Sequence, residues 1–329
     1  MQYRRLGRSD LKVSVVSMGC WAIVGDGTWG PQDESDAIAA IQASLDAGVK
    51  FFDTAEGYGG GYSEELLGRG LAGRRNEVVI ATKVSRSHLS PEALKECCEG
   101  SLRRLNVEAI DLYIVHWPSR DIPIAETWRA MEDLKREGKV RALGVSNFAG
   151  GDLAKLLAVG RPEANQLPYS LLWRPIEYEV VPVCVENDVS ITCYSPLAQG
   201  LLTGKFKTAD DVPAGRARTR LFSSSRPQAR HGEPGAEEET FAAIDRVRAV
   251  AEELGQPMNR VALAWALAQP GVGSVIAGAR SAEQAKENAA AGDLTLPEDV
   301  VKKLSDATAK LKQHFGTNPD MWRSESRMR

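Results

Sequence analysis

The chain has 329 residues, of which 43% are hydrophobic and 26% charged, ordinary proportions for a globular protein with a large core. Its formal charge at pH 7 is only −3, which argues against a polyanion such as nucleic acid as a partner. The start, MQYRRLGRSD, holds no apolar stretch, and no run of about 18 apolar residues occurs elsewhere. We therefore expect no secretory signal, no membrane span and a cytoplasmic location.

The predicted strands and helices alternate from about residue 13 to residue 290. Most of the apolar segments are continuous, as expected of strands that are buried on both faces. In chain order the predicted strands are 15–19, 50–54, 78–84, 111–116, 140–146, 163–169, 190–196 and 273–278. Eight strands, each followed by a helical stretch, predict an α/β fold of the (β/α)8 TIM-barrel type. An open doubly wound sheet would use fewer strands and a nucleotide-binding turn after the first.

Two of the predicted helices have recognisable ends. One begins at Ser90-Pro91, an N-cap followed by proline at the first helical position, and another stops at Gly138 in the C′ position. Their apolar residues recur at helical spacing. These residues are Leu94, Cys97, Cys98, Leu102 and Leu105 in the first helix, and Ile124, Trp128, Met131 and Leu134 in the second.

Two segments fall outside the alternation. Residues 2–13 predict a hairpin with its turn at Gly7–Asp10, which would plug the bottom of the barrel. Residues 205–240, between the seventh and eighth strands, are polar and rich in proline, glycine, serine and arginine. Such a segment is either a functional lid or disordered, and we favour a partly mobile lid. No change in composition marks a second domain, so residues 1–329 are expected to form a single one.

Several familiar motifs are absent or misplaced. GDGTWG at 25–30 matches the dinucleotide-binding pattern GxGxxG, but the next helix is expected only near Ser35, so a plain glycine-rich loop is the better interpretation. No tyrosine precedes a lysine by four residues, and no GxSxG occurs. The five cysteines form no CxxC pair, which is typical of reduced thiols in the cytosol. The four histidines show no paired spacing, so we expect no metal site.

Four polar residues cluster near the ends of consecutive predicted strands. Asp53, Lys83 and His116 end the second, third and fourth strands, and Tyr58 follows in the loop after the second. The C-terminal ends of parallel barrel strands are where reactive groups gather. A buried ammonium needs a partner, and Asp53 is the natural one for Lys83. Each residue alone has a structural explanation, as a turn former, ion pair or packing group, but the four together indicate an active site.

The Tyr58 phenol is the candidate acid of this site. A neighbouring ammonium favours the phenolate, which is expected to lower the pKa of Tyr58 from about 10 toward the working range. Such a phenol can protonate a carbonyl oxygen as the carbon gains a hydride, with His116 orienting that oxygen. No side chain supplies a hydride, so we infer a nicotinamide cofactor.

At these residues the chain resembles the aldo-keto reductases, and within them the bacterial general-stress-protein and potassium-channel β-subunit-like branch. The matching motifs occur in family order along nearly the whole chain. They are FDTAEGYG (52–59), ATKV (81–84), HWP (116–118), GVSNF (144–148), YSPLAQGLLTGK (194–205) and ARSAEQAKEN (279–288). The resemblance implies that Asp53, Tyr58, Lys83 and His116 are the catalytic tetrad, without substitution. It also implies a (β/α)8 barrel that binds NADPH or NADP+ and reduces a small carbonyl substrate.

The same resemblance implies where the cofactor binds. Ser146, Asn147 and Gln166 would lie at the nicotinamide carboxamide, Tyr194 under the ring, and Gly19, Cys20 and Trp21 along its pocket. Ser195, Leu197, Gly200 and Lys205 would lie at the pyrophosphate, and Gly278, Arg280, Gln284 and Asn288 at the adenosine. Asp53 would also contribute to the cofactor site. The guanidinium of Arg280 suits a 2′-phosphate and therefore NADP. Trp21, Trp29, Trp117 and Trp173 are candidates either for an aromatic pocket wall or for the core.

Three functions stay open at this point. The leading hypothesis is NADPH-dependent reduction of an aldehyde or ketone to an alcohol. The alternative is an NADP(H)-occupied redox sensor or interaction subunit with slow or vestigial turnover, as the channel subunits suggest. A metal-dependent barrel hydrolase is a third possibility, and the sparse histidines argue against it. The physiological substrate, the reaction direction and the oligomeric state do not follow from the sequence.

Overall fold

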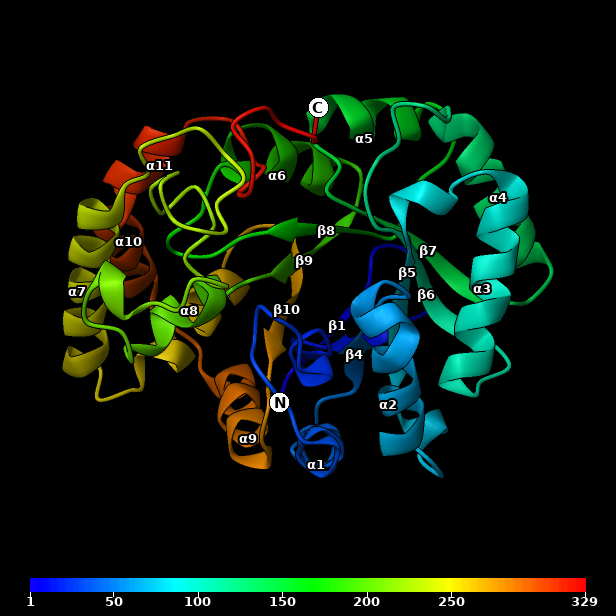
Figure 1. Cartoon of the computed structure of the whole chain (residues 1–329), viewed down its shortest axis with the longest axis horizontal. Helices are drawn as coiled ribbons and strands as arrows, with labels where there is room; N and C mark the ends of the chain where they lie inside the picture. Colours follow the sequence, from blue (N-terminus) through cyan, green and yellow to red (C-terminus); the bar gives the residue numbers. More distant parts are fainter.

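The computed structural model describes residues 1–329 and contains a closed barrel of parallel strands surrounded by helices (Figure 1). The barrel strands are β3 (Val16–Gly19), β4 (Phe51–Asp53), β5 (Val79–Val84), β6 (Ile110–Val115), β7 (Val140–Ser146), β8 (Ala164–Pro168), β9 (Ser190–Tyr194) and β10 (Val272–Gly278). Neighbouring strands follow chain order, and β10 closes the ring against β3. The predicted TIM barrel is confirmed, and each strand lies within two residues of its predicted segment.

The helices pack around the outside of this barrel. They are α1 (Glu34–Asp46), α2 (Tyr62–Gly70), α3 (Pro91–Leu105), α4 (Ile124–Arg136), α5 (Gly150–Leu157), α6 (Ile176–Glu186), α7 (Glu237–Glu253), α8 (Met258–Leu267), α9 (Ala282–Ala290), α10 (Glu298–Ala307) and α11 (Ala309–Phe315). Ser90 caps α3 by accepting a hydrogen bond from the Ala93 N–H, and Gly138 follows α4 with a φ of 76°. Both predicted helix ends are therefore confirmed. None of the helices combines the length and the apolar character needed to cross a bilayer.

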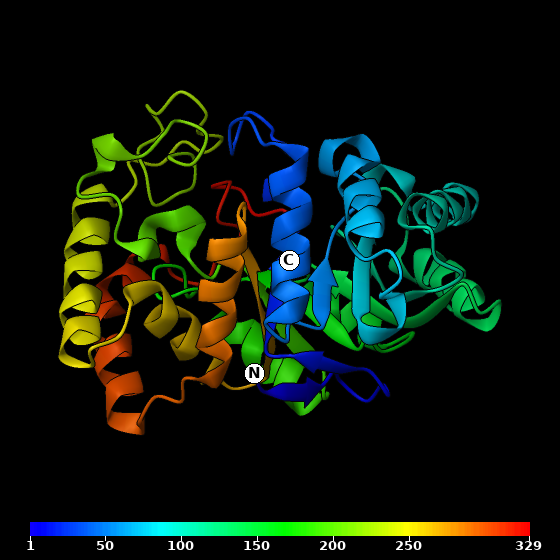
Figure 2. The same cartoon turned by 90° about the horizontal axis from the view of Figure 1, so that it is seen from below.

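The N-terminal hairpin closes one end of the barrel, as predicted. Its strands, β1 (Tyr3–Arg5) and β2 (Lys12–Ser14), pair antiparallel. Leu6, Leu11 and Val13 of the hairpin pack against apolar side chains inside the barrel. Figure 2 shows this hairpin at the opposite end of the molecule from the loops that precede α7. An open site is therefore confined to the end where the strands finish.

The long segment between β9 and α7 folds over that open end as a lid. It is irregular apart from short 3-10 turns, and α7 already begins at Glu237, inside the predicted lid. Leu221 and Phe222 are buried. Ion pairs from Arg220 to Glu233 and from Arg226 to Glu237 hold the loop together. The buried apolar pair and these ion pairs give residues 205–236 a defined path across the barrel.

Candidate active site

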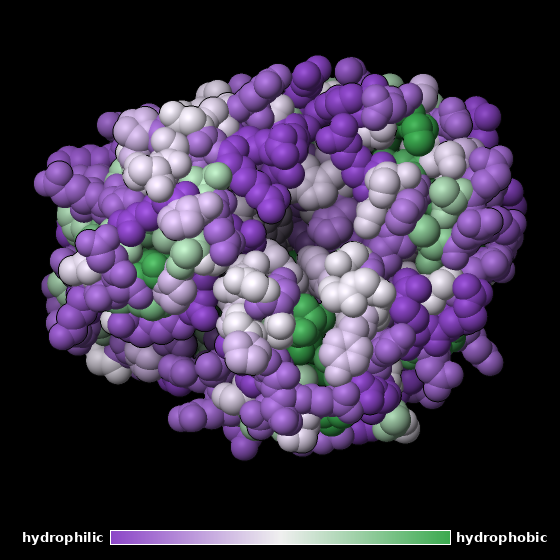
Figure 3. Space-filling model, in the orientation of Figure 1, coloured by the Kyte–Doolittle hydropathy of each residue, from purple (hydrophilic) through white to green (hydrophobic).

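A cavity of about 850 Å³ opens at the C-terminal ends of the barrel strands, beneath the lid. Figure 3 shows the molecular face hollowed near its centre, with hydrophilic side chains around much of the opening. Most of the predicted site residues line this one cavity. They are Gly19, Trp21, Asp53, Tyr58, His116, Ser146, Asn147, Gln166, Tyr194, Ser195, Leu197, Gly200, Lys205, Gly278, Arg280, Gln284 and Asn288. Lys83 lies below the cavity wall, in contact with Asp53 and Tyr58.

The alternation of side chains along the strands explains why these polar groups meet. Phe51, Ala81, Leu112, Ala142 and Ala164 pack together inside the barrel with the hairpin residues. Inward-facing positions recur every second residue. The next inward positions on three of the strands hold Asp53, Lys83 and Gln166. The barrel interior therefore changes from apolar near the hairpin to polar near the lid.

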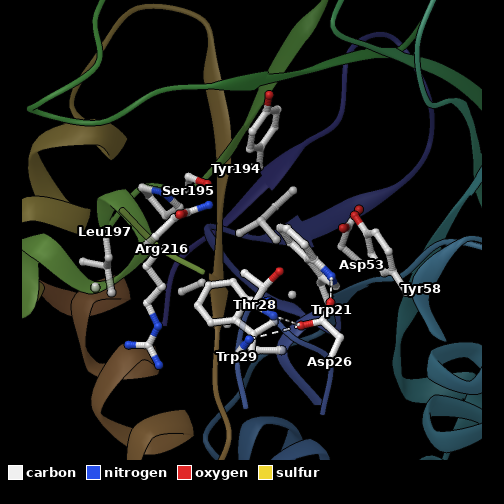
Figure 4. Close-up of a pocket in the computed structure, with 18 of the residues that line it drawn as sticks. Trp21, Asp26, Thr28, Trp29, Asp53, Tyr58, Tyr194, Ser195, Leu197 and Arg216 are labelled. Carbon is white, nitrogen blue, oxygen red and sulfur yellow. Dashed lines mark hydrogen bonds between the residues drawn. The ribbon is translucent and has the colours of Figure 1, made fainter. Parts of the chain in front are cut away.

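A chain of hydrogen bonds joins five of the inward-facing and loop residues. Lys83 Nζ donates to Asp53 Oδ1 at 2.6 Å and to the Thr54 carbonyl at 2.7 Å, and lies 3.3 Å from Tyr58 Oη. The other Asp53 oxygen accepts from Gln166 Nε2 at 2.7 Å. Figure 4 shows Asp53 and Tyr58 side by side at one end of the cavity. Lys83 is wholly buried and Asp53 is 3% exposed, so this is a buried ion pair with a phenol at its outer end.

Burial decides the protonation of the site. Burial raises the pKa of the Tyr58 phenol, and the Asp53 charge adds to this rise, whereas the Lys83 ammonium opposes it. The predicted net lowering of the Tyr58 pKa is therefore wrong, because loss of hydration outweighs the ammonium. Burial also disfavours the ammonium of Lys83, but the charge of Asp53 and the hydrogen bonds with Asp53 and Tyr58 outweigh it and raise the Lys83 pKa. The site thus holds a protonated phenol beside a charged lysine.

His116 faces the same phenol. Its ring lies edge-on to Tyr58, with 5.8 Å between the ring centroids. Burial, and then the charge of Lys83, lower the pKa of His116 to about 3. The imidazole is therefore neutral at ordinary pH and has one N–H to donate. The Trp21 ring stacks on Tyr58, with 5.9 Å between the ring centroids and an interplanar angle of 20°.

Asn147 organises the next part of the cavity. It has a left-handed φ of 65° although it is buried, a conformation that asparagine tolerates better than most residues. Its backbone N–H donates to the Gln166 carbonyl and its Nδ2 to the His116 carbonyl, both at 2.9 Å. Its Oδ1 accepts from the Tyr194 hydroxyl at 2.9 Å. Asn147 thus links the C-terminal ends of β6, β7 and β9 to one another.

The far end of the cavity is cationic and small-residue-lined. Three cations, Lys205, Arg216 and Arg280, lie close together there. The pKa of Lys205 is lowered first by burial and then by the positive charges of the two arginines. Gly200 has a φ of 96°, and a Cβ there would lie 3.2 Å from Lys205 Cε. Neither amide atom of buried Gln199 has a hydrogen-bond partner. Unbalanced positive charge, close backbone approach and unpartnered polar atoms together fit a phosphate-bearing cofactor.

Arg280 ties this end of the cavity to the GDGTWG loop. Its Nε donates to Gln32 Oε1 and its Nη1 to the Trp29 carbonyl, each at 2.7 Å, and its Nη2 donates to the Pro31 carbonyl. Residues 29–32, which we call the strap, therefore run beside the cavity. The loop opens no helix, since α1 begins only at Glu34. GDGTWG is thus followed by no helix of its own, as expected from the sequence, and its residues Asp26, Thr28 and Trp29 line the cavity.

Some expectations about individual residues need correction. Cys20 does not line the cavity: its side chain is fully buried, with Sγ directed at the Met18 carbonyl. Trp173 belongs to the core, where its Nε1 donates to the Pro319 carbonyl at 3.1 Å. Trp21, Trp29 and Trp117 do line the cavity.

Several lining residues escaped the sequence analysis altogether. These are chiefly Gln199, Arg216, Arg218, Arg230, Trp322, Arg323 and Arg327. For Arg216, Arg218 and Arg230, the arginine-rich composition of the lid was the one feature of the sequence that could have indicated them. Nothing in the sequence pattern placed the C-terminal tail at the cavity.

One group of possible metal ligands lies elsewhere. Glu56, His88 and Cys97 bring one ligand atom each within 4.8 Å of the others. Glu56 Oε1 already accepts from the Ser85 N–H at 2.7 Å and lies 2.8 Å from His88 Nδ1. These contacts tie the loop that carries Tyr58 to the loop after β5. None of the three residues lines the cavity.

Known proteins resemble this chain in sequence and in fold. The model of the Aldo/keto reductase family matches residues 15–309. The chain is 33% identical to the NADH-specific methylglyoxal reductase of Escherichia coli (strain K12), over 94% of this chain and 97% of that protein. It is 34% identical to a probable voltage-gated potassium channel subunit beta of Oryza sativa subsp. japonica, over 92% and 95%. An aldo/keto reductase from Klebsiella pneumoniae, solved in complex with NADP and acetate, superposes with a TM-score of 0.73 at 32% identity, over 92% and 94%.

The barrel, its cavity and these similarities define an oxidoreductase with a (β/α)8 fold. Within that class the chain belongs to the aldo/keto reductase family.

Proposed function

We propose that the protein reduces an aldehyde or ketone to the alcohol with NADPH, using Tyr58 as the general acid. The observation that carries the proposal is the buried Asp53–Lys83–Tyr58 chain, which ends at an open cavity beside the neutral imidazole of His116. Phenol, ammonium and imidazole in this order can hold a carbonyl oxygen and deliver a proton to it.

Each residue has a separate task in this reaction. A bound reduced nicotinamide would supply the hydride for the carbonyl carbon. The Tyr58 phenol, protonated at rest, donates its proton to the carbonyl oxygen, so that an alcohol and a tyrosinate result. Lys83 Nζ, 3.3 Å from Tyr58 Oη, stabilises that tyrosinate until a solvent proton replaces the one lost. His116 donates a hydrogen bond to the same oxygen and keeps it beside Tyr58, while Asp53 holds the lysine in place.

The cofactor would lie along the cavity in the order that the family resemblance implies. Ser146, Asn147 and Gln166 would bind the carboxamide above Tyr194, next to Gly19 and Trp21. Ser195, Leu197, Gly200 and Lys205 would bind the pyrophosphate, and Gly278, Arg280, Gln284 and Asn288 the adenosine. All of these residues line the cavity. The placement adds Arg216 to the phosphate-binding cations.

The preference for NADP is supported by charge. The Klebsiella pneumoniae structure is described with NADP, whereas the Escherichia coli relative is named as NADH-specific, so the relatives by themselves do not decide the matter. In this chain Lys205, Arg216 and Arg280 gather at one end of the cavity. Three cations match a pyrophosphate together with a 2′-phosphate better than a pyrophosphate alone.

We further propose that residues 1–329 work as one domain. The hairpin at the N-terminus closes the barrel, and Trp322 and Arg327 from the C-terminal tail line the cavity at the other end. Both ends of the chain thus contribute to the same barrel.

The experiment is to follow NADPH consumption by absorbance with a small panel of aldehydes and ketones. Tyr58→Phe should keep its affinity for NADPH and lose turnover by about 10²–10⁴-fold, the usual contribution of a general acid. Tyr62→Phe is the matched control, because its hydroxyl bonds Glu34 at the surface and lies outside the cavity. A Tyr58→Phe variant that turns over normally removes Tyr58 from the proposed role.

A second function, a cofactor-occupied sensor or interaction subunit, is favoured by one observation. Arg280 fastens the strap beside the cavity through three hydrogen bonds, and such a contact would slow cofactor exchange. Rapid mixing with NADPH and a reducible aldehyde separates the two functions. A fast first turnover followed by a much slower steady rate supports the sensor, whereas equal rates support the reductase.

A further inference from the structure

The cavity holds a second set of cations on the side of Tyr58. Arg218 and Arg230 from the lid and Arg323 and Arg327 from the C-terminal tail line it. Among these four, only Arg327 forms an ion pair, with Asp320 at 2.8 Å. We propose that Arg218, Arg230 and Arg323, the arginine rim, bind an anionic group of the substrate, so that the protein reduces carbonyl compounds carrying a carboxylate or a phosphate. This inference rests on the proposed carbonyl reduction and names its substrate class.

Arg218 is the central residue of the rim. Its guanidinium carbon lies 5.5 Å from the Trp21 ring centroid and 5.0 Å from that of Trp322. These aromatic contacts hold the side chain in place with its donor edge free. Its buried Nε has no hydrogen-bond partner. A fixed, half-buried guanidinium with unpartnered donors is a ready receptor for a planar or tetrahedral oxyanion.

No acidic side chain of the cavity neutralises this cation. Asp26 is the carboxylate whose charge acts on Arg218. It already accepts hydrogen bonds from Trp21 Nε1 and from the Thr28 N–H, each at 2.9 Å. Burial, and then the charge of Arg230, lower the pKa of Arg218, and Asp26 offsets this only in part. The site therefore carries an excess of positive charge that a bound anion would relieve.

The rim is distinct from the cations that face the cofactor. Arg216 stacks on Trp29 at 5.5 Å, and its pKa is lowered by burial and then by Arg280. Figure 4 shows Arg216 on the Leu197 side of Trp29, with Trp21 and Tyr58 on the other side. The cofactor phosphates would occupy the first set and leave the second for the substrate.

The position of the rim limits the shape of the substrate. Trp21 contacts both Arg218 and Tyr58, so one aromatic ring separates the anion receptor from the catalytic acid. The reacting carbonyl must reach Tyr58 Oη, so several atoms must lie between the carbonyl and the anionic group. A 2-oxo acid, in which the two groups are adjacent, does not meet this requirement. An aldehyde with its carboxylate or phosphate at the other end of a short chain or ring does.

The approach to the cavity has the same charge. A neighbouring hollow of about 480 Å³ shares Arg230, Arg323 and Arg327 with it and also contains Arg86 and Arg329. Glu325 is the one acidic residue of that hollow. A concave surface with one sign of charge raises the local concentration of counter-ions. It would thus draw anionic substrates toward the rim.

The test compares each anionic aldehyde with a neutral analogue of it. We expect kcat/KM for 4-carboxybenzaldehyde to exceed that for its methyl ester by about 10- to 150-fold, the value of one charge-assisted hydrogen-bond pair. The same comparison of glyceraldehyde 3-phosphate with glyceraldehyde tests a phosphate. The pair with the larger ratio of kcat/KM values shows which anion the rim prefers. In Arg218→Met the ratio should fall toward one, mainly through KM. Arg218→Lys should restore part of it, because the charge returns.

Arg216→Met is the matched control, since Arg216 lies two residues away in the same loop and also stacks on a tryptophan. It should weaken NADPH binding and keep the substrate ratio. If the wild type reduces the charged and neutral partners equally, the rim inference is wrong and the reductase stands. If it reduces no carbonyl, the reductase proposal fails instead. Calorimetric titration of the NADP+-loaded protein with 4-(hydroxymethyl)benzoate then decides the rim, because binding that Arg218→Met weakens supports it and no binding overturns it.

Discussion

Replacing Lys83 by methionine should destabilise the fold as well as impair the reaction. Lys83 is wholly buried, and its Nζ lies 2.6 Å from the carboxylate of Asp53, itself 3% exposed. Methionine fills a similar volume, so the main loss is the counter-charge, and Asp53 keeps only its bond from Gln166. Removing one partner of a buried pair costs about 3–5 kcal/mol. With an unfolding entropy of about 2 cal/mol/K per residue, Tm should fall by roughly 4–7 °C.

The control is the double variant in which Lys83→Met is combined with Asp53→Asn. This double variant has no charge at either position 53 or position 83, so it should be more stable than Lys83→Met alone. Urea unfolding at neutral pH, supported by calorimetry, measures both. A double variant as unstable as the single one would show that the loss comes from packing, and the electrostatic reasoning would be refuted.

Two further predictions concern pH and the cofactor. Between pH 6.5 and about 3 the imidazole of His116 binds a proton in the unfolded chain but not in the folded one, so wild-type stability should fall with decreasing pH by at most about 1.4 kcal/mol per unit. His116→Gln should remove this contribution to the pH dependence of stability. If the urea midpoints of the variant and the wild type change equally from pH 7 to pH 4, the prediction is contradicted. Arg280→Met should weaken NADPH binding at least tenfold and NADH binding much less, measured by fluorescence titration, with Lys302→Met on exposed α10 as control. Equal losses for both cofactors would mean that Arg280 acts only through the strap.

The sequence by itself determined the barrel and singled out the residues that we propose as catalytic. The apolar segments are continuous because both faces of each strand are covered, so β7 (Val140–Ser146) and its neighbours could be located without any tertiary information. Asp53, Lys83 and His116 were recognisable because a polar residue at the end of an apolar strand has few structural uses. The hairpin followed from its turn residues and from its position before the first barrel strand.

Only the tertiary structure decided the electrostatics of the site. The pKa of Tyr58 rises because desolvation outweighs Lys83, and desolvation depends on everything that covers the phenol, including segments far away in the chain. The same is true of contacts: Arg280 meets the strap, and Arg218 lies between Trp21 and Trp322, only once the barrel has closed and the lid and tail have folded over it. Local patterns encode which residues form strands, whereas the charge balance of a cavity is a sum over all the segments that surround it.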